Sequence, residues 1–320
     1  MKKFKLTISF IFLLYLSFGG VFPLYAQEGE DSIYSFYLRD SVRITIDRPA
    51  SFQKYKETII CLYGLPNGNT TEQTMGRKLV PGLDWHYDIQ HIRAQTKFIR
   101  EHLPKNFVVI YLENNFKSWP MWSQRNGGNH MQKISQLIDT IWGLFPLKKK
   151  SLYLNGHSGG GRLIFAWLGA LERIPNYVKR ISFLDSDYGY DSTYYPLFRL
   201  WLHKVKGSAL NVFAYNDSVA LYNGKPFVSA TGGTWYRSHL FLRHLERDFE
   251  IRKLRDDSLV VYGDHDKRVQ FFLKPNPDRQ IYHTRQVELN GFIHSILCGT
   301  LLDSKNYRYY GPRAYNDLIE

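Results

Sequence analysis

The sequence predicts an α/β fold with a mostly parallel central sheet flanked by helices, and a small hairpin-like insertion before the last strand. Short apolar runs of strand length alternate with longer segments whose apolar residues recur at helical spacing. A glycine-rich turn joins one such run to one such segment. The 320 residues are 44% hydrophobic and 22% charged, so the chain can bury a full core without a disulfide or a metal ion.

The strands are predicted from their apolar patterns. Ser41–Asp47 alternates between apolar and polar residues in the manner of an edge strand. Thr58–Tyr63 is almost continuously apolar and is followed by Gly64, as expected of a buried parallel strand. The remaining predicted strands are Phe107–Leu112, Ser151–Asn155, Arg180–Leu184, Ala209–Tyr215 and Arg285–Leu289.

Helices are predicted between most of these strands. Asp88–Leu103 carries apolar residues at helical spacing and stops before Pro104. The other predicted helices are Met131–Phe145, Gly160–Leu171 and a segment from about Thr234 to Phe249.

One region, Leu254–Asp278, interrupts this alternation. It contains two short apolar runs, Leu259–Tyr262 and Val269–Leu273, on either side of a polar turn, Gly263-Asp264-His265-Asp266. Two short strands about a polar turn are typical of a hairpin. We therefore expect an insertion at about residues 254–278, before the last strand of a single domain that spans residues 27–320.

The strongest chemical signal is the sequence Gly156-His157-Ser158-Gly159-Gly160, which follows a predicted strand and opens a predicted helix. A serine on such a turn adopts strained backbone angles, and the flanking glycines leave room for tight packing. The turn exposes the hydroxyl at a helix N-terminus, where negative charge is stabilised. This context predicts that Ser158 is a nucleophile; the alternative is a structural serine in a glycine-rich turn.

This turn, the alternation of strands and helices, and the positions of a later acid and histidine resemble the α/β-hydrolase superfamily over nearly all of residues 40–300. The resemblance implies a serine hydrolase whose catalytic residues follow one another as nucleophile, acid and histidine. It identifies no subfamily.

The histidine that best fits that order is His294, which follows the predicted strand Arg285–Leu289 and a short turn containing Gly291. As general base it would take the proton from Ser158 and return it to the leaving group. His265 lies in the polar hairpin turn, and His283 precedes the predicted last strand, so both are less favoured. The alternative is that His294 is a structural residue whose ring nitrogens form hydrogen bonds with nearby groups.

The acid is predicted at Asp217, because a strand ends at Tyr215 and the carboxylate follows at the usual acid position. It would orient the imidazole and stabilise the imidazolium. Asp185 and Asp187 follow the preceding strand and stay open as alternatives, since some hydrolases of this fold use that position. A residue not used as the acid would cap a loop or contact substrate.

Two backbone N–H groups are needed for an oxyanion hole. Gly159, directly after the nucleophile, should supply one. The loop Gly64-Leu65-Pro66-Asn67-Gly68-Asn69 should supply the other, and Leu65 is the better donor because Pro66 has no N–H. This loop departs from the His-Gly-Gly-Gly pattern of many lipases and esterases.

No cofactor and no metal site is predicted. His86, Asp88 and His91 lie close together in sequence, but two histidines five residues apart do not share a helix face, and no further ligand pattern is evident. A polar cluster at the mouth of the site is favoured. The tryptophans Trp119, Trp122 and Trp235 are candidates for stacking on sugar or aromatic acyl groups, or for the core.

Residues 1–26 read as a secretory signal peptide. Three lysines precede an apolar run from Leu6 to Phe22, and Ala26 stands at the expected cleavage point before an acidic segment. An uncleaved anchor is the alternative, although the run is shorter than the ~20 residues of a spanning helix. We expect an exported protein, periplasmic or secreted, with no stable membrane anchor after cleavage.

Removal of the three signal-peptide lysines takes the formal charge from +13 to +10, and a basic exported protein suits association with anionic polymers or membrane surfaces, or simply has a solvated basic surface. No basic block with interleaved aromatic residues indicates nucleic-acid binding. Cys61 and Cys298 both lie in apolar runs and are expected to be buried free thiols, with a disulfide as the alternative.

The sequence therefore predicts an exported serine hydrolase that cleaves an ester through a Ser158 acyl-enzyme. Its substrate would be a small ester or an acyl group on a polysaccharide. A serine peptidase or amidase is one alternative, and an inactive binding protein of the same fold is another.

Overall fold

The computed structural model describes residues 31–38 and 41–320. The predicted signal peptide, residues 1–26, lies outside this part of the chain. In the described residues, none of the helices has the length and apolar character needed to cross a membrane.

A ten-stranded sheet forms the centre of the molecule, and its order is β1-β2-β4-β3-β5-β6-β7-β12-β11-β10. The six strands from β4 to β12 in this order run parallel, whereas both outer pairs are antiparallel. The strands are β1 (Ser32–Leu38), β2 (Val42–Arg48), β3 (Thr58–Gly64), β4 (Asn106–Asn114), β5 (Lys150–His157), β6 (Val178–Leu184), β7 (Ala209–Tyr215), β10 (Arg252–Asp256), β11 (Val260–Gly263) and β12 (Val269–Lys274). The predicted mostly parallel sheet is confirmed.

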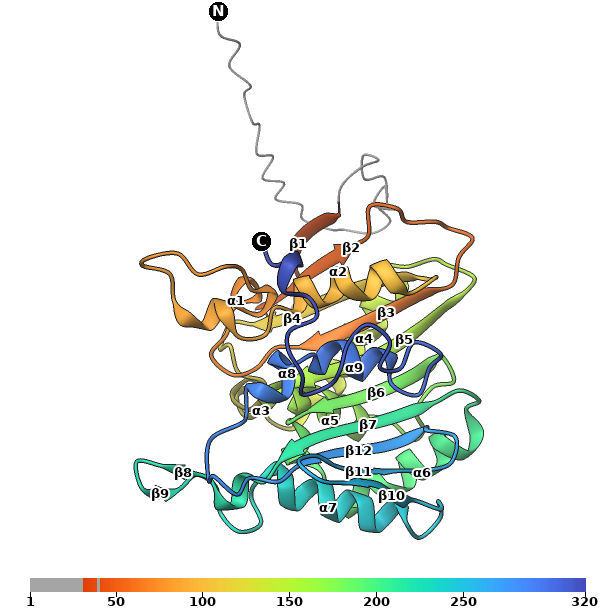
Figure 1. Ribbon diagram of the computed structural model, residues 1–320. Coiled ribbons are helices and arrows are strands. Elements are labelled where there is room, and N and C mark those ends of the chain that lie inside the picture. The colour runs from red at the N-terminus through yellow and green to blue at the C-terminus, as the bar shows by residue number, and fades with distance from the viewer. Residues whose placement is uncertain (1–30, 39–40) are drawn as a thin grey trace, which may run out of the picture.

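Helices cover both faces of this sheet, as Figure 1 shows. Helices α3 to α7 pack on one face with one hydrophobic cluster, and α2, α9 and the C-terminal segment pack on the other face with a second cluster. The helices are α1 (Thr71–Met75), α2 (Ile92–His102), α3 (Trp119–Asn126), α4 (His130–Gly143), α5 (Gly161–Gly169), α6 (Tyr195–Lys204), α7 (Thr234–Leu245), α8 (Arg285–Glu288) and α9 (Gly291–Leu297).

The alternation of side chains along the strands explains the two clusters. In β3, Ile60 and Leu62 belong to the first cluster, whereas Ile59, Cys61 and Tyr63 belong to the second. Successive side chains of a strand point to opposite faces, so a continuously apolar strand must be covered on both sides. The predicted buried strand Thr58–Tyr63 is therefore confirmed.

The first predicted strand is not at the edge. β2 occupies the predicted segment, but β1 pairs with it antiparallel from Ser32↔Arg48 to Leu38↔Val42. All residues of β2 except Arg43 are buried, because β1 covers its outer side. The prediction of an edge strand at Ser41–Asp47 is therefore wrong in position.

The C-terminal strands also differ from the prediction. The runs Leu259–Tyr262 and Val269–Leu273 do pair as a hairpin, from Val260↔Leu273 to Gly263↔Gln270. However, β12 also pairs in parallel with β7, so the hairpin is part of the central sheet and β12 is its last strand in sequence. The predicted strand Arg285–Leu289 is wrong, because these residues form the short helix α8 and the turn after it.

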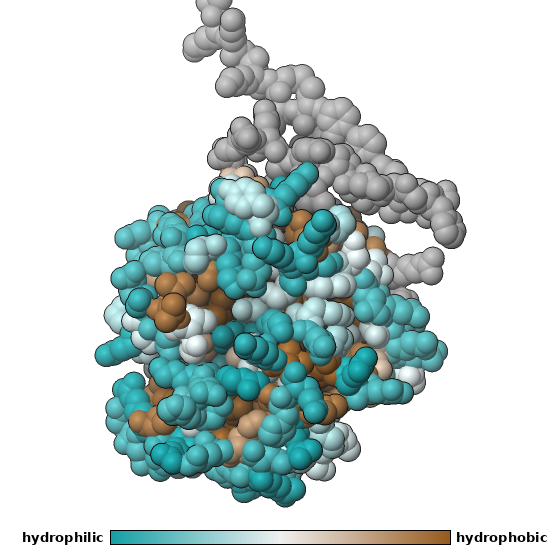
Figure 2. Space-filling model, turned by 90° about the vertical axis from the view of Figure 1, so that its right-hand side faces the viewer, coloured by the Kyte–Doolittle hydropathy of each residue, from teal (hydrophilic) through white to brown (hydrophobic). Residues whose placement is uncertain are grey.

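The loops after the parallel strands lie at one edge of the sheet, on the left of Figure 1, together with α1, α8 and the small hairpin of β8 (Leu221–Tyr222) and β9 (Lys225–Pro226). Figure 2 shows the opposite edge, where hydrophilic residues cover most of the surface and apolar residues form smaller areas between them. The carboxyl ends of parallel strands are where α/β folds place their sites.

Both cysteines are buried free thiols, as expected. Burial raises the pKa of the Cys298 thiol to about 11, so it stays protonated at neutral pH. Trp119 and Trp122 are core residues at 1% exposure, with their rings 5.7 Å apart. They are therefore not free to stack on a ligand.

The glycines of the Ser158 turn provide a test of this packing. A Cβ atom on Gly160 would lie 2.0 Å from the backbone oxygen of Gly64, whereas one on Gly143, at the end of α4, would meet nothing within 4 Å. We expect Gly160→Ala to lower the free energy of unfolding by at least about 2 kcal/mol, because neither backbone can move away easily. Urea titration measures this.

Gly143→Ala is the matched control and should leave stability unchanged or raise it by up to about 1 kcal/mol, since alanine favours the helix. Equal stability of the two variants would contradict the close packing of β3 against the Ser158 turn.

Candidate active site

Ser158 lies on the turn between β5 and α5, and its backbone has the positive φ of 54° expected of a strained strand-to-helix turn. Residues Ser158–Gly160 form a short 3-10 turn before α5 begins at Gly161. The Ser158 side chain is partly exposed, while Gly159 and Gly160 are buried. The strand, turn and helix around Ser158 therefore form as the sequence predicts, at the carboxyl edge of the sheet.

Several close backbone contacts require the glycines of this turn. A Cβ atom on Gly161 would lie 1.8 Å from the backbone oxygen of Ser186, and one on Gly156 would lie 2.9 Å from the carbonyl carbon of Gly160. These distances are far below van der Waals contact, so the turn can pack against the ends of β3 and β6 only without side chains.

His283 and Asp185 form a hydrogen-bonded pair beside this turn. The Nδ1 atom of His283 donates to Oδ2 of Asp185, which directly follows β6. Asp185 is fully buried, and the His283 side chain is 18% exposed. With Nδ1 as the donor, the Nε2 atom of His283 is left as the acceptor that a general base needs.

His157, the residue before Ser158, links His283 to the turn. Its ring lies 4.5 Å from the His283 ring, and its Nε2 donates to the backbone oxygen of His283 at 3.2 Å. Burial and then the charge of His283 hold the pKa of His157 well below its usual value, so His157 stays neutral. These contacts place His283 against the residue that directly precedes Ser158.

His294 is found elsewhere in the structure. It belongs to α9, is 5% exposed, and bonds through Nδ1 to the hydroxyl of Tyr307 at 3.0 Å. Its ring packs on Phe272 and Tyr309 at 4.6 and 5.2 Å. Burial lowers its pKa to about 4. In the described part of the chain these contacts do not connect His294 to Ser158.

The course of α9 explains this position. Gly291, the first residue of α9, lies beside Leu184 at the carboxyl end of β6. Cys298, the residue after the helix, accepts a hydrogen bond through its backbone oxygen from Arg180, which lies near the start of β6. His294 therefore lies over the middle of the sheet rather than beyond its edge. His283, by contrast, follows the last strand β12, which is where the fold resemblance expects the histidine. Pro275 and Pro277, directly after the apolar run 269–274, are the sequence signal for the end of that strand.

Asp217 follows β7 as predicted, but its carboxylate binds the start of α7. Oδ2 accepts from the N–H of Thr234 at 2.8 Å, and Oδ1 accepts from the N–H of Trp235 at 3.3 Å. These N–H groups have no partner within the helix, so Asp217 caps α7. The Thr234 hydroxyl donates to Asp185 and also lies 3.3 Å from Asp217, which links the two carboxylates.

Asp187 is the third buried carboxylate of this region. It accepts from the hydroxyl of Ser238 at 2.9 Å. Burial raises its pKa well above the usual value, and the charge of Asp185 adds to this shift. The structure therefore brings Asp185, and neither Asp187 nor Asp217, to the imidazole of His283.

The predicted oxyanion loop lies against the nucleophile turn. Gly64 and Gly160 are in backbone contact, as described above, and Leu65 is buried at 3% exposure. Asn67 lies directly against Gly159. The loop after β3 is thus next to Gly159, as an oxyanion hole formed by Gly159 and Leu65 would require.

The polar cluster near α2 is held together internally. His91 bonds through Nε2 to Asp88 at 2.7 Å, and Arg313 pairs with Asp88 at 2.6 Å and with Glu288 at 2.7 Å. His86 pairs with Asp84. In residues 31–38 and 41–320 there is no group of three or more His, Cys, Asp or Glu side chains placed to hold a metal ion.

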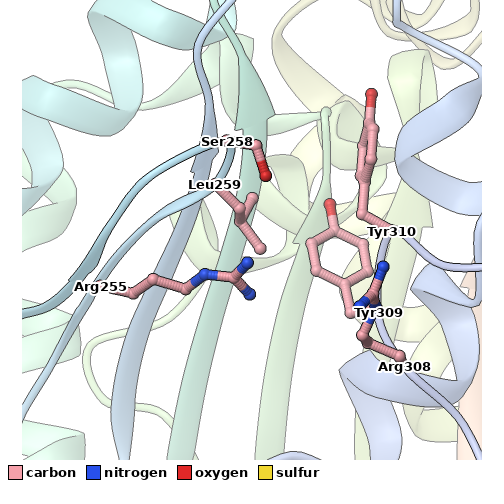
Figure 3. A pocket seen from close by; sticks show the side chains of 6 residues that line it. All are labelled: Arg255, Ser258, Leu259, Arg308, Tyr309 and Tyr310. Carbon is pink, nitrogen blue, oxygen red and sulfur yellow. The ribbon is translucent and has the colours of Figure 1, made fainter.

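A separate hollow of about 40 Å³ opens at the outer strands. Figure 3 shows its lining, with Arg255 pointing toward Leu259 and Tyr309. The residues that line it are Arg255, Ser258, Leu259, Arg308, Tyr309 and Tyr310. Tyr309 donates to Gln286 at 2.7 Å, three residues after His283. The Arg255 guanidinium pairs with Asp257 at 2.8 Å, so its charge is already balanced within the protein.

Comparison with known proteins adds distant structural likenesses. No family model matches the sequence, and no curated protein matches it. An uncharacterised protein from Capnocytophaga ochracea is 11% identical with a TM-score of 0.46; the match covers 83% of this chain but only 64% of that one, less than two thirds of its length.

Two esterases are similar to a comparable degree. A feruloyl esterase module from Clostridium thermocellum, complexed with sinapinate, is 10% identical with a TM-score of 0.47, over 84% of this chain and 89% of that one. Acetyl xylan esterase from Aspergillus awamori is 11% identical with a TM-score of 0.43, over 76% and 92%. The strand order and the turn at Ser158 themselves place the chain in the α/β-hydrolase fold class.

The burial of Asp217 predicts a pH effect on stability. Burial and then the charge of Asp185 raise its pKa to about 6, above the value of about 3.9 that an aspartate has in an unfolded chain. Between these values the folded protein holds a proton that the unfolded chain releases, so stability must fall as pH rises. We expect wild type to lose on the order of 3 kcal/mol relative to Asp217→Asn between pH 4 and pH 7.

Urea titrations of both proteins at several pH values measure this difference, and the Asn variant serves as the control that cannot titrate. A difference that rises with pH would mean that the α7 N–H groups stabilise the ionised carboxylate more than burial destabilises it.

Proposed function

We propose that this protein is a serine hydrolase that cleaves esters through a covalent acyl-enzyme on Ser158. In this proposal His283 is the general base and Asp185 is the acid, in place of His294 and Asp217. The observation that carries it is the hydrogen bond from His283 to the buried Asp185, beside a strained serine turn.

The geometry supports the following sequence of steps. The Ser158 oxygen attacks the ester carbonyl while Nε2 of His283 takes its proton, and Asp185 stabilises the imidazolium that forms. The N–H groups of Gly159 and Leu65 stabilise the oxyanion. His283 then protonates the alcohol as it leaves, and a water molecule, activated by the same histidine, releases the acid.

Asp185 is well prepared to hold the imidazole. One of its oxygens accepts from His283, and the other accepts from the Thr234 hydroxyl. Asp185 has a positive φ of 47°, and its N–H donates to the Phe213 carbonyl at 2.7 Å. Both carboxylate oxygens and the backbone are therefore held in place, which fixes the direction from which the imidazole is bound.

We further propose that the protein is exported and acts in the periplasm or outside the cell, on a small ester or an acyl group linked to a polysaccharide. The lysine-led apolar start of the chain supports export. The formal charge falls from +13 to +10 without its three lysines, which still suits association with anionic polymers. Initial rates on short acyl esters and on aminoacyl amides distinguish an esterase from a peptidase or amidase.

The first experiment is labelling with a fluorophosphonate, which reacts only with an activated serine. We expect wild type to label, Ser158→Ala to lose labelling, and His283→Ala to label at least about 10³-fold more slowly. His294→Phe keeps the volume of a buried ring and is the matched control, expected to label at the wild-type rate. The proposal fails if folded His283→Ala labels normally while folded His294→Phe does not.

The second experiment separates the two carboxylates. We expect Asp185→Asn to lower kcat on a short acyl ester by about 10²- to 10⁴-fold, because the imidazole loses its orienting partner. Asp217→Asn should stay within about tenfold of wild type, because that carboxylate caps α7. A larger loss for Asp217→Asn, in protein that melts as a folded domain, would restore Asp217 as the acid.

A further inference from the structure

The loop after β3 is anchored at both ends. At its start, a Cβ atom on Gly64 would lie 2.7 Å from the backbone oxygen of Gly160, so the two backbones are in contact. In its middle, the N–H of Gly68 donates to the backbone oxygen of Lys117 at 2.7 Å. At its end, the Thr70 hydroxyl caps α1 by accepting from the N–H of Gln73 at 3.2 Å. These contacts hold Asn67 in a defined position.

The carboxamide of Asn67 lies directly against the residue that follows the nucleophile. An ideal Cβ atom on Gly159 would lie 2.0 Å from Oδ1 of Asn67, 2.5 Å from Cγ and 2.9 Å from Nδ2. Gly159 is therefore required for a second reason besides the turn, since any side chain would occupy the space of this amide.

The Asn67 carboxamide is free to bind a ligand. The residue is exposed, and its side chain has no hydrogen-bond partner among the described residues. Its oxygen and nitrogen exchange places by a half-turn about the Cβ–Cγ bond, so either can face an oxygen of the substrate.

The loop after β3 has few backbone N–H groups that could donate to an oxyanion. Pro66 has no N–H, so residues 65 and 66 together supply only one backbone donor, from Leu65. The oxygen of a tetrahedral intermediate on Ser158 would lie beside the N–H of Gly159, and the Asn67 amide is next to Gly159.

We propose that Asn67 is a catalytic residue whose side-chain N–H donates a hydrogen bond to the oxyanion formed on Ser158. This inference rests on the proposed function and adds a side-chain donor to the backbone donors of Gly159 and Leu65. No bond to Asn67 forms or breaks; its amide stabilises negative charge that is present only in the transition state and intermediate.

The test compares Asn67→Ala and Asn67→Asp with wild type on a short acyl ester. We expect kcat to fall by about 10²- to 10³-fold in both variants, with KM within about threefold, because the donor acts only on the developing oxyanion. Asn67→Asp keeps the shape of the side chain and removes its N–H groups. Asn129→Ala is the matched control, an exposed asparagine whose side chain caps nothing, and should keep the wild-type kcat.

A second readout measures affinity for an alkyl boronic acid, which forms a tetrahedral adduct on an activated serine. Its affinity should fall in parallel with kcat for both Asn67 variants. Unchanged kcat in Asn67→Asp, or a raised KM with unchanged kcat, overturns the role of Asn67 while the proposed function stands. Absence of both esterase activity and labelling in wild type instead overturns the proposed function itself.

Discussion

The candidate site depends on backbone packing that only glycine permits. Gly160 touches the end of β3, and Gly161 touches the residue after Asp185. A single turn therefore brings the ends of three strands within contact of one another. Ser158 has its strained φ because these contacts hold it there, and the loop bearing Asn67 and the carboxylate of Asp185 approach the serine for the same reason.

Around this turn, three buried carboxylates have different roles because their partners differ. Asp185 accepts from an imidazole and a hydroxyl, Asp217 from the first N–H groups of α7, and Asp187 from a serine hydroxyl. Burial raises the pKa values of Asp187 and Asp217, and the charge of Asp185 raises both further. Carboxylates this close cannot all be ionised without cost, and burial adds to that cost for Asp187 and Asp217.

The positions of the histidines show where prediction from the sequence failed. His283 was disfavoured because residues 285–289 resemble a strand, yet they form α8. Arg-Gln-Val-Glu-Leu is too short for the spacing of its two apolar residues to distinguish a strand from a turn of helix. The true last strand, β12, looked like part of a hairpin because it does pair with β11; its pairing with β7 depends on residues about sixty positions away in sequence.

By itself, the sequence determined the fold class, five of the six parallel strands, four of the helices that cover them and the turn at Ser158, because apolar period and glycine pattern are local properties of the chain. It also narrowed the acid to three carboxylates at two strand ends. Only the tertiary structure decided which of them meets a histidine, which histidine that is, and that Asn67 lies against Gly159. Those contacts join loops from separate strands, and their geometry is set by the order and register of the sheet, which no local pattern encodes.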